Sequence, residues 1–235
     1  MAKKLYEESN IQAIADSIRA KNGTTTTYKT SEMAAAIDGI TTGGEDTLGM
    51  RLNNTLTSYT YDKYLYQLPN WAFYNCTSLT SVSMSALDEI APYGFSGCTG
   101  LQEINFPAVR AIKAYAFQNC TSLTEVYLPG SGLSLATSVF DGCSNLTKIT
   151  LTNASSITDC KGASALETLI LSSDTLVTTT TGTTSFFHSS SPLYNGTGYI
   201  YVPSALIDSY KTHYAWSVWA DQFRAIEDYP DITGG

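Results

Sequence analysis

The chain contains 235 residues, of which 43% are hydrophobic and only 14% are charged, and its net charge is -8 at pH 7. This length and hydrophobic content are sufficient for one large domain with a buried core. The acidic balance argues against nucleic acid or an anionic membrane as the partner, because both attract clustered lysine and arginine. Since no apolar run reaches the roughly 18 residues needed to cross a bilayer, membrane insertion is not expected.

The first 44 residues are predicted to form a helical pair that ends in a linker. Three isoleucines between residues 11 and 18 have helical spacing, and a second short helix is expected at 32–38. Gly43-Gly44 is typical of a linker, so we predict a boundary between a helical segment, 1–44, and a second unit, 45–235. The first residues lack the apolar stretch of a signal peptide. The chain would therefore stay in the cytoplasm or leave it by another route, unless a native signal has been removed.

From residue 68 to 172 the sequence repeats every 22 or 23 residues. Each unit contains a phenylalanine, a cysteine three residues later, a leucine three residues after that, and then an apolar pair at alternate positions. The repeated cysteines are Cys76, Cys98, Cys120 and Cys143. Their spacing is neither that of a disulfide framework nor that of a metal motif, so we interpret them as small buried side chains. A fifth copy, 160–171, keeps the leucines but lacks Phe and Cys at these positions.

Each unit predicts one strand and one tight corner. The alternate apolar residues after each leucine point to one face of a strand. The residue before each cysteine is Asn or Gly, and these residues tolerate a positive φ best, so a left-handed corner is expected there. The phenylalanines should stack from one coil to the next. One unit cannot bury its own apolar face but stacked units can, which predicts a solenoid with a parallel sheet along one side and strands about 4.8 Å apart.

Atypical segments are expected to close both ends of the solenoid. Residues 45–67 would form a first coil, and 172–198 would form an extended insertion that is packed in part through its two phenylalanines and a leucine. A helix is expected to start at Pro203, and the aromatic-rich stretch 216–226 follows it. This pattern predicts a helical C-terminal cap. A sugar-stacking site is the alternative interpretation of these aromatic residues.

The repeat resembles that of the BspA-like, treponemal-type branch of the leucine-rich-repeat family, whose units contain Ala-Phe-x-x-Cys-x-x-Leu-x-x-Val-x-Leu-Pro. The match is close over residues 68–172 and extends more loosely to the strand 199–203, while Gly94 and Val139 depart mildly from the Ala-Phe pair. The resemblance implies surface adhesion or protein recognition and no shared enzymatic activity. The expected fold is therefore an α/β leucine-rich-repeat solenoid with a parallel sheet along its concave side, a small helical N-terminal segment and a helical C-terminal cap. The helical pair in 1–44 resembles segments of tail and other structural proteins of phages and prophages of gut Firmicutes.

No catalytic residue, metal ligand or cofactor is predicted. The two histidines, His188 and His213, belong to no metal or nucleophile motif. Glu103 and Glu125 occupy the same outward position in adjacent units, and glycosidases use paired carboxylates about 5 to 10 Å apart. Lys148 follows in the next unit and can neutralise the pair, however, and an open sheet excludes water poorly. We therefore interpret the two glutamates as part of a solvated face.

The outward residues of the predicted sheet form two rows, and we expect the binding contacts there. The candidate residues are Glu103, Asn105, Glu125, Tyr127, Lys148, Thr150, Tyr199 and Tyr201. The tyrosines are expected to contribute most, because tyrosine adds contact area with little loss of entropy. The alternative is that these are ordinary exposed strand residues, since Tyr and Thr have high β-propensity.

Two functions follow from these patterns. One is a non-enzymatic recognition module, on a cell surface or carried by a phage, that binds a protein or a cell-surface glycan. The alternative is a structural component of a phage or prophage particle that has no ligand of its own. In both cases the N-terminal helices could contact an assembly partner. An extracellular or virion-associated location is favoured over a cytoplasmic one.

Overall fold

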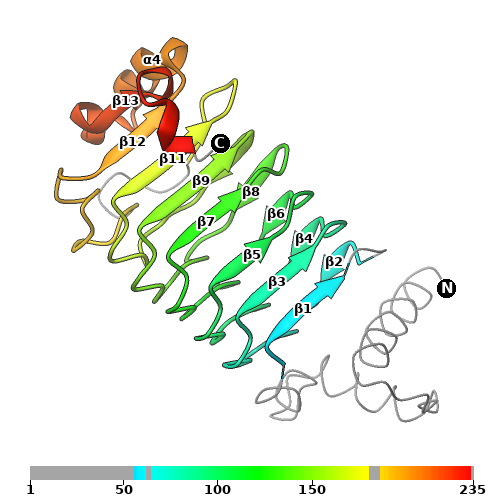
Figure 1. Ribbon diagram of the computed structural model, residues 1–235. Helices are drawn as coiled ribbons and strands as arrows, with labels where there is room; N and C mark the ends of the chain where they lie inside the picture. Colours follow the sequence, from blue (N-terminus) through cyan, green and yellow to red (C-terminus); the bar gives the residue numbers. More distant parts are fainter. Residues whose placement is uncertain (1–55, 62–64, 180–185, 234–235) are drawn as a thin grey trace, which may run out of the picture.

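The computed structural model describes residues 56–61, 65–179 and 186–233. These residues form an elongated solenoid in which the chain passes from one coil to the next through two sheets of parallel strands (Figure 1). The predicted parallel-sheet solenoid is therefore confirmed. The helical pair expected in 1–44 and the boundary at residue 44 lie outside the described residues.

The front sheet carries the strands that the repeat predicts, and it is divided into two parts. The three-stranded part contains β1 (Ser58–Tyr61), β3 (Ser81–Met84) and β5 (Glu103–Asn105). The five-stranded part contains β7 (Glu125–Leu128), β9 (Lys148–Thr152), β11 (Thr168–Ser172), β12 (Tyr199–Val202) and β13 (Phe223–Ala225). Along each strand, residues that point into the core alternate with residues that point outward, as expected from the period of two.

A back sheet runs along the other side of the coils (Figure 1). Its strands are β2 (Gln67–Leu68), β4 (Glu89–Ile90), β6 (Ala111–Ile112), β8 (Leu133–Leu135) and β10 (Ala154–Ile157). Each strand directs at least one aliphatic side chain into the core, where it is almost completely buried. This sheet was not predicted, because most of its strands are too short to produce a recognisable alternation of apolar and polar residues.

The core between the sheets is built from identical positions stacked coil on coil. The rings of Phe73, Phe95, Phe117 and Phe140 stack in turn with centroid distances of 5.1, 5.2 and 5.9 Å. Tyr59 extends this stack at its N-terminal end, at 5.0 Å from Phe73. The predicted phenylalanine stack is confirmed, and it joins neighbouring coils through close contact of large apolar surfaces.

The repeated cysteines lie beside this stack and are buried. Three of the four thiols donate a hydrogen bond to the backbone carbonyl of a phenylalanine in the preceding coil. The Sγ–O distances are 2.9 Å for Cys98 to Phe73, 3.2 Å for Cys120 to Phe95 and 3.0 Å for Cys143 to Phe117. Burial raises the pKa of Cys143 to about 12, so its thiol stays protonated and unreactive at neutral pH. The cysteines therefore serve the packing of the coils, as the sequence indicates.

Each regular coil turns at two left-handed corners. The predicted corner is confirmed, with φ of 56° at Asn75, 77° at Gly97, 57° at Asn119 and 72° at Gly142. Asn and Gly alternate because a Cβ atom at Gly97 or Gly142 would collide with the asparagine side chain of the preceding coil.

The second corner was not predicted, because it places bulky residues at a positive φ. The residues at this corner are Trp71, Tyr93, Tyr115 and Ser138. A left-handed conformation costs a non-glycine residue about 1–3 kcal/mol. Ring stacking compensates in part, since Trp71 lies 4.0 Å from Tyr93 and Tyr93 lies 5.1 Å from Tyr115.

The C-terminal end is less helical than expected. Its helical turns are η2 (Ser204–Leu206), α4 (Ile207–Thr212), η3 (Ser217–Gln222), η4 (Ile226–Asp228) and η5 (Pro230–Thr233). Between η3 and η4 the chain returns to the front sheet as β13, which pairs with the edge of β12. A helical cap is therefore not supported. The edge of β12 exposes backbone groups that need partners, and a strand provides them where a helix could not.

The aromatic residues of the stretch 216–226 are buried, so they do not form a sugar-stacking surface. Trp216 is 0% exposed, and its indole Nε1 donates to the carbonyl of Val177 at 2.9 Å. The backbone N–H of Val177 in turn donates to the Tyr210 hydroxyl at 2.9 Å. Phe186 of the insertion packs against Trp216 at 4.9 Å. As expected, the insertion is packed through its apolar residues, and it closes the end of the core together with the C-terminal segment.

Candidate binding face

The structure brings most of the predicted binding residues into two rows on the outer side of the front sheet, which we call the front face. In the first row Glu125, Lys148, Thr168 and Tyr199 are in register. In the second row Tyr127, Thr150, Ile170, Tyr201 and Arg224 are in register. On the three-stranded part, Glu103 and Asn105 continue the rows and pair with Ser81 and Ser83.

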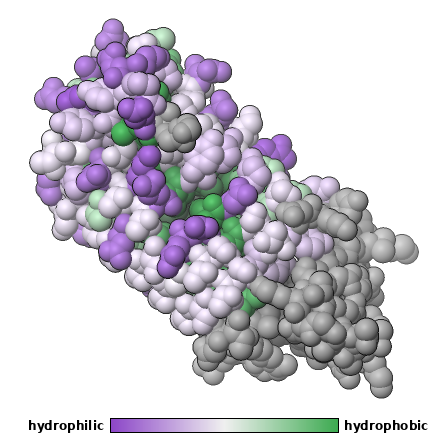
Figure 2. All heavy atoms as spheres, in the orientation of Figure 1, coloured by the Kyte–Doolittle hydropathy of each residue, from purple (hydrophilic) through white to green (hydrophobic). Residues whose placement is uncertain are grey.

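The two parts of the front sheet meet between β5 and β7 without a backbone ladder in the described chain. The expected rung between Glu103 and Glu125 is therefore not formed. Ile104, the core residue of β5, is only partly buried, whereas Val82 and Val126 at the equivalent positions are 3% and 2% exposed. Figure 2 shows apolar surface in a hollow of this face, between hydrophilic side chains. The break thus makes one part of the front face different from a uniform solvated sheet.

Charged and aromatic side chains surround this break. Glu103 and Glu125 are exposed, and Lys148 reaches Glu125 with an Nζ–Oε2 distance of 3.8 Å. Asn105 donates to the Ser83 hydroxyl across the sheet at 3.1 Å. Tyr127 is 55% exposed, an unusually high value for so large a side chain in a sheet. This region offers carboxylates, one ammonium group and an exposed ring to a partner.

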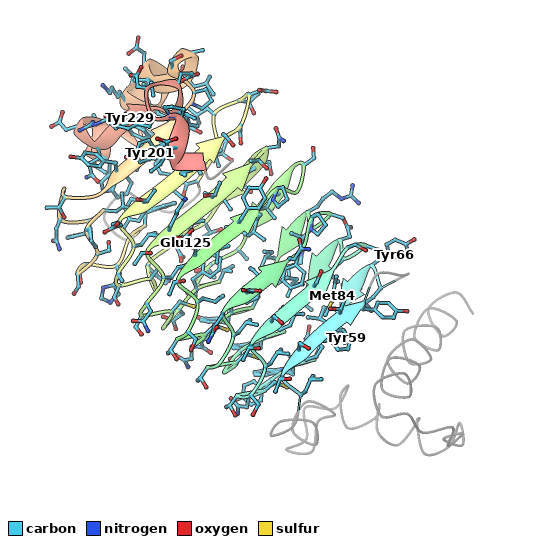
Figure 3. All side chains as sticks on the ribbon, in the orientation of Figure 1. Tyr59, Tyr66, Met84, Glu125, Tyr201 and Tyr229 are labelled. Carbon is cyan, nitrogen blue, oxygen red and sulfur yellow. The ribbon has the colours of Figure 1, made fainter. Side chains whose placement is uncertain are left out.

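The C-terminal half of the front face is covered, and two predicted binding residues are buried there. Thr150 is 4% exposed and Tyr201 is 6% exposed, although both point outward from the sheet. The C-terminal segment returns over β11 and β12, and the ring of Tyr229 packs against Tyr201 at 5.2 Å (Figures 1 and 3). The alternation of a strand shows which side chains point outward but not what lies over them, so the expectation of exposure was wrong for Thr150 and Tyr201.

Beside this covered region, Arg224 forms a cluster with Tyr199 and Tyr201. Its guanidinium carbon lies 4.3 Å from the centroid of the Tyr199 ring, a favourable cation–π distance. Tyr199 remains 40% exposed. Burial, together with the neighbouring phenol of Tyr229, raises the pKa of Tyr201, so its hydroxyl is protonated at neutral pH. Sequence reasoning missed Arg224 because β13 lies outside the repeat.

Both histidines of the chain take part in local hydrogen bonds. His188 accepts a hydrogen bond from the Ser190 amide at 3.1 Å, and His213 accepts one from the Ala215 amide at 3.3 Å, so both stabilise local turns. Over the described ranges, no group of three His, Cys, Asp or Glu residues is placed to hold a metal ion. A search of the same residues finds no helix that is long and apolar enough to span a membrane.

Two solved structures share the solenoid. A leucine rich cell surface protein from Faecalibacterium prausnitzii is 25% identical over 64% of this chain and 41% of that protein, with a TM-score of 0.52. The pneumococcal vaccine antigen PcpA is 18% identical over 72% of this chain and 40% of its own, with a TM-score of 0.55, and shows the fold alone. The chain thus spans about two fifths of the length of either protein. No curated protein sequence matches the chain.

The repeat itself places the chain in a family. The BspA type leucine rich repeat region matches residues 67–192 in six copies, which is more than half of the sequence. Proteins with this repeat are typically non-enzymatic, and the similar protein from F. prausnitzii is described as a leucine rich cell surface protein. The chain belongs to the family of BspA-type leucine-rich-repeat proteins.

Proposed function

We propose that this protein is a recognition module that attaches to a protein or glycan on another surface through its front face. The observation that carries this proposal is the exposed ring of Tyr127 next to the break between β5 and β7, where Ile104 is only partly buried. Exposed tyrosines combined with accessible apolar surface are typical of interface hot spots. Elsewhere on the three-stranded part the outward residues are small and polar, such as Ser81 and Ser83.

The comparisons support an extracellular setting for this role. The similar protein from F. prausnitzii is described as a cell surface protein, and the same location is proposed for this chain. A role as a structural component of a phage or prophage particle is the other proposal. It rests on the sequence of residues 1–44 alone, which lie outside the described part of the chain.

The test is a double variant, Tyr127→Ala with Glu125→Ala, assayed for binding to epithelial cell surfaces and to a glycan array. Since hot-spot truncations cost 2 kcal/mol or more, binding is expected to fall at least about thirtyfold. The matched control is Tyr66→Ala with Glu89→Ala on the back sheet, which also removes an exposed tyrosine and a glutamate paired with lysine. Circular dichroism checks the fold of both variants. If the folded front-face variant binds as well as the parent while the chain does bind, the front face is not the site.

A further inference from the structure

Arg224 is the most unusual charged residue on the front face, because its side chain is held from two directions. Both hydrogens of Nη1 are used by backbone carbonyls, those of Asp221 at 2.8 Å and Phe223 at 2.9 Å. The plane of the guanidinium lies against the Tyr199 ring, with 4.3 Å from Cζ to the ring centroid. An arginine fixed in this way has already lost most of its rotamer freedom, so a ligand that binds to it pays little further entropy.

The remaining edge of this guanidinium is free. Arginine carries five N–H donors, of which Nη1 supplies two. Among the residues that the structure describes, no acceptor engages Nε or Nη2 of Arg224 and no carboxylate lies within ion-pair distance. Nε–H and one Nη2–H point in parallel and match the two oxygens of a carboxylate. The protein therefore presents an oriented, unoccupied fork for a planar anion.

The neighbouring Tyr201 hydroxyl provides a second polar group. Tyr201 is adjacent to Arg224 in the parallel register of β12 and β13 and is only 6% exposed. In the described part of the chain its hydroxyl has no hydrogen-bond partner. Among the described residues this hydroxyl is not one of the buried polar atoms without a partner, so it is accessible to solvent and can be reached by a ligand. Because the phenol is neutral, it can donate to an anion next to the arginine.

The surrounding surface favours a sugar over a peptide as the carrier of that anion. Tyr199 and Tyr229 are 40% and 41% exposed and border Tyr201 at 6.4 and 5.2 Å. Exposed aromatic rings pack well on the apolar C–H face of a pyranose. An acidic peptide with several negative charges would be repelled by a chain of net charge -8, whereas a single carboxylate on an otherwise neutral sugar would not.

We infer that Arg224, Tyr201, Tyr199 and Tyr229 form a binding site for the carboxylate of an acidic sugar at the C-terminal end of the front face. Arg224 holds the carboxylate with its free edge, Tyr201 donates a hydrogen bond to it, and the exposed rings contact the sugar. This site lies three strands away from Tyr127, on β12 and β13 rather than on β7, and it stands independently of the function proposed above.

The experiment is a titration of the full chain with two sugars that carry a single carboxylate, sialyllactose and galacturonic acid, with lactose as the neutral control and an acetylated aspartate tripeptide as the acidic control. Binding is followed by saturation-transfer NMR and calorimetry. We expect both acidic sugars to bind with dissociation constants of about 1 mM, and lactose and the peptide to bind at least about tenfold more weakly. Failure of both acidic sugars to bind, or equal binding of the peptide, would overturn the inference.

Two conservative variants test the geometry. Arg224→Lys keeps the charge but removes the two-pronged edge and should weaken sugar binding about tenfold. Tyr201→Phe keeps the ring and removes only the hydroxyl, and should weaken it about fivefold. Arg110→Lys, on the back sheet, is the matched control and should have no effect. Unchanged binding by folded Arg224→Lys contradicts the site. The Tyr127→Ala and Glu125→Ala variant should retain sugar binding, so the two proposals fail separately.

Discussion

The regular coils, residues 68–151, and the last coils, residues 152–225, belong to the same solenoid but are held together by different contacts. In the regular coils each phenylalanine stacks on the equivalent one of the next coil, and the thiols of Cys98, Cys120 and Cys143 each donate a hydrogen bond to the coil before. In the last coils Cys160 stands at the phenylalanine position. Its amide donates to the carbonyl of Phe186 in the insertion at 2.7 Å, and the Phe186 ring packs against Trp216 of the C-terminal segment.

The difference shows how repetition distributes stability. In the regular coils every contact has equivalent copies 22 or 23 residues away, and the loss of one leaves the others in place. The end is held by single contacts between segments far apart in the chain, such as the Tyr210–Val177 and Trp216–Val177 hydrogen bonds over 33 and 39 residues. A substitution there has no equivalent to replace it.

The largest effect is expected from the loss of a buried phenylalanine ring, either in the stack of the regular coils or in the insertion. Phe117→Ala in the middle of the stack should lower the free energy of unfolding by about 3–5 kcal/mol, because both a large apolar side chain and its packing are lost. Phe186→Ala in the insertion should cost a similar amount, since this side chain is also 0% exposed. Denaturant unfolding measures both, with the exposed Tyr66→Ala as the control. A loss below about 1 kcal/mol for Phe186→Ala would show that the insertion is not part of the core.

A smaller loss of stability is expected when a single tyrosine hydroxyl is removed. Tyr210→Phe removes the acceptor of the Val177 amide, which is buried, and an unsatisfied buried amide costs about 1–3 kcal/mol. Tyr93→Phe makes the same change on the half-exposed stack of the regular coils, where water can replace the hydroxyl, and should cost less than about 0.5 kcal/mol. Thermal unfolding of both variants gives the difference. Equal losses would mean that the hydrogen bond from the Val177 amide to the Tyr210 hydroxyl does not stabilise the C-terminal end.

The smallest effect concerns an exposed ion pair on the back of the regular coils. Hydrogen bonding to Arg110 lowers the pKa of Asp88, so the pair stabilises the fold above the unfolded pKa of about 3.9. This contribution is lost as the pH falls through the lower folded pKa. Asp88→Asn should cost less than about 1 kcal/mol at pH 7, with no difference from the parent once the pH is below the folded pKa.

The buried Asp159 provides the contrast for this pair. It is 1% exposed and accepts hydrogen bonds from the Ser138 amide at 2.9 Å and the Thr137 hydroxyl at 2.6 Å. Asp159→Asn should therefore cost more than Asp88→Asn at pH 7. Urea unfolding at several pH values compares the two, and a larger loss for the exposed aspartate would contradict the assignment of buried and exposed roles.

The periodic features could be predicted because each of them recurs in several repeats of the sequence. Four copies show that Asn75 and its equivalents alternate with glycine, and this pattern identifies the corner with positive φ. The corner at Trp71, Tyr93 and Tyr115 is equally periodic, but no local preference places an aromatic residue there. It is stable only because rings of neighbouring coils stack, which is a property of the assembled solenoid.

The sequence predicted which residues form the two rows of the front face, but it did not predict which of them are exposed to solvent. The period of a strand correctly gave the outward direction of Tyr127 and Glu125. It could not show that Tyr229 covers Tyr201, because this contact joins a segment outside the repeat to the sheet. Arg224 was missed for the same reason. Features that depend on one contact between dissimilar segments leave no periodic signal.

The break between β5 and β7 has a mechanical consequence for a molecule that attaches to surfaces. A pull along the long axis of the solenoid loads the contacts between coils in series. Between the neighbouring regular coils two backbone ladders share the load. Across this break one ladder, that of β6 with β8, shares it with the backbone hydrogen bonds of the corners, such as that from the Phe95 amide to the Ala116 carbonyl, and with the packed core. Among the regular coils we therefore expect extension to begin at this break, next to the exposed ring of Tyr127.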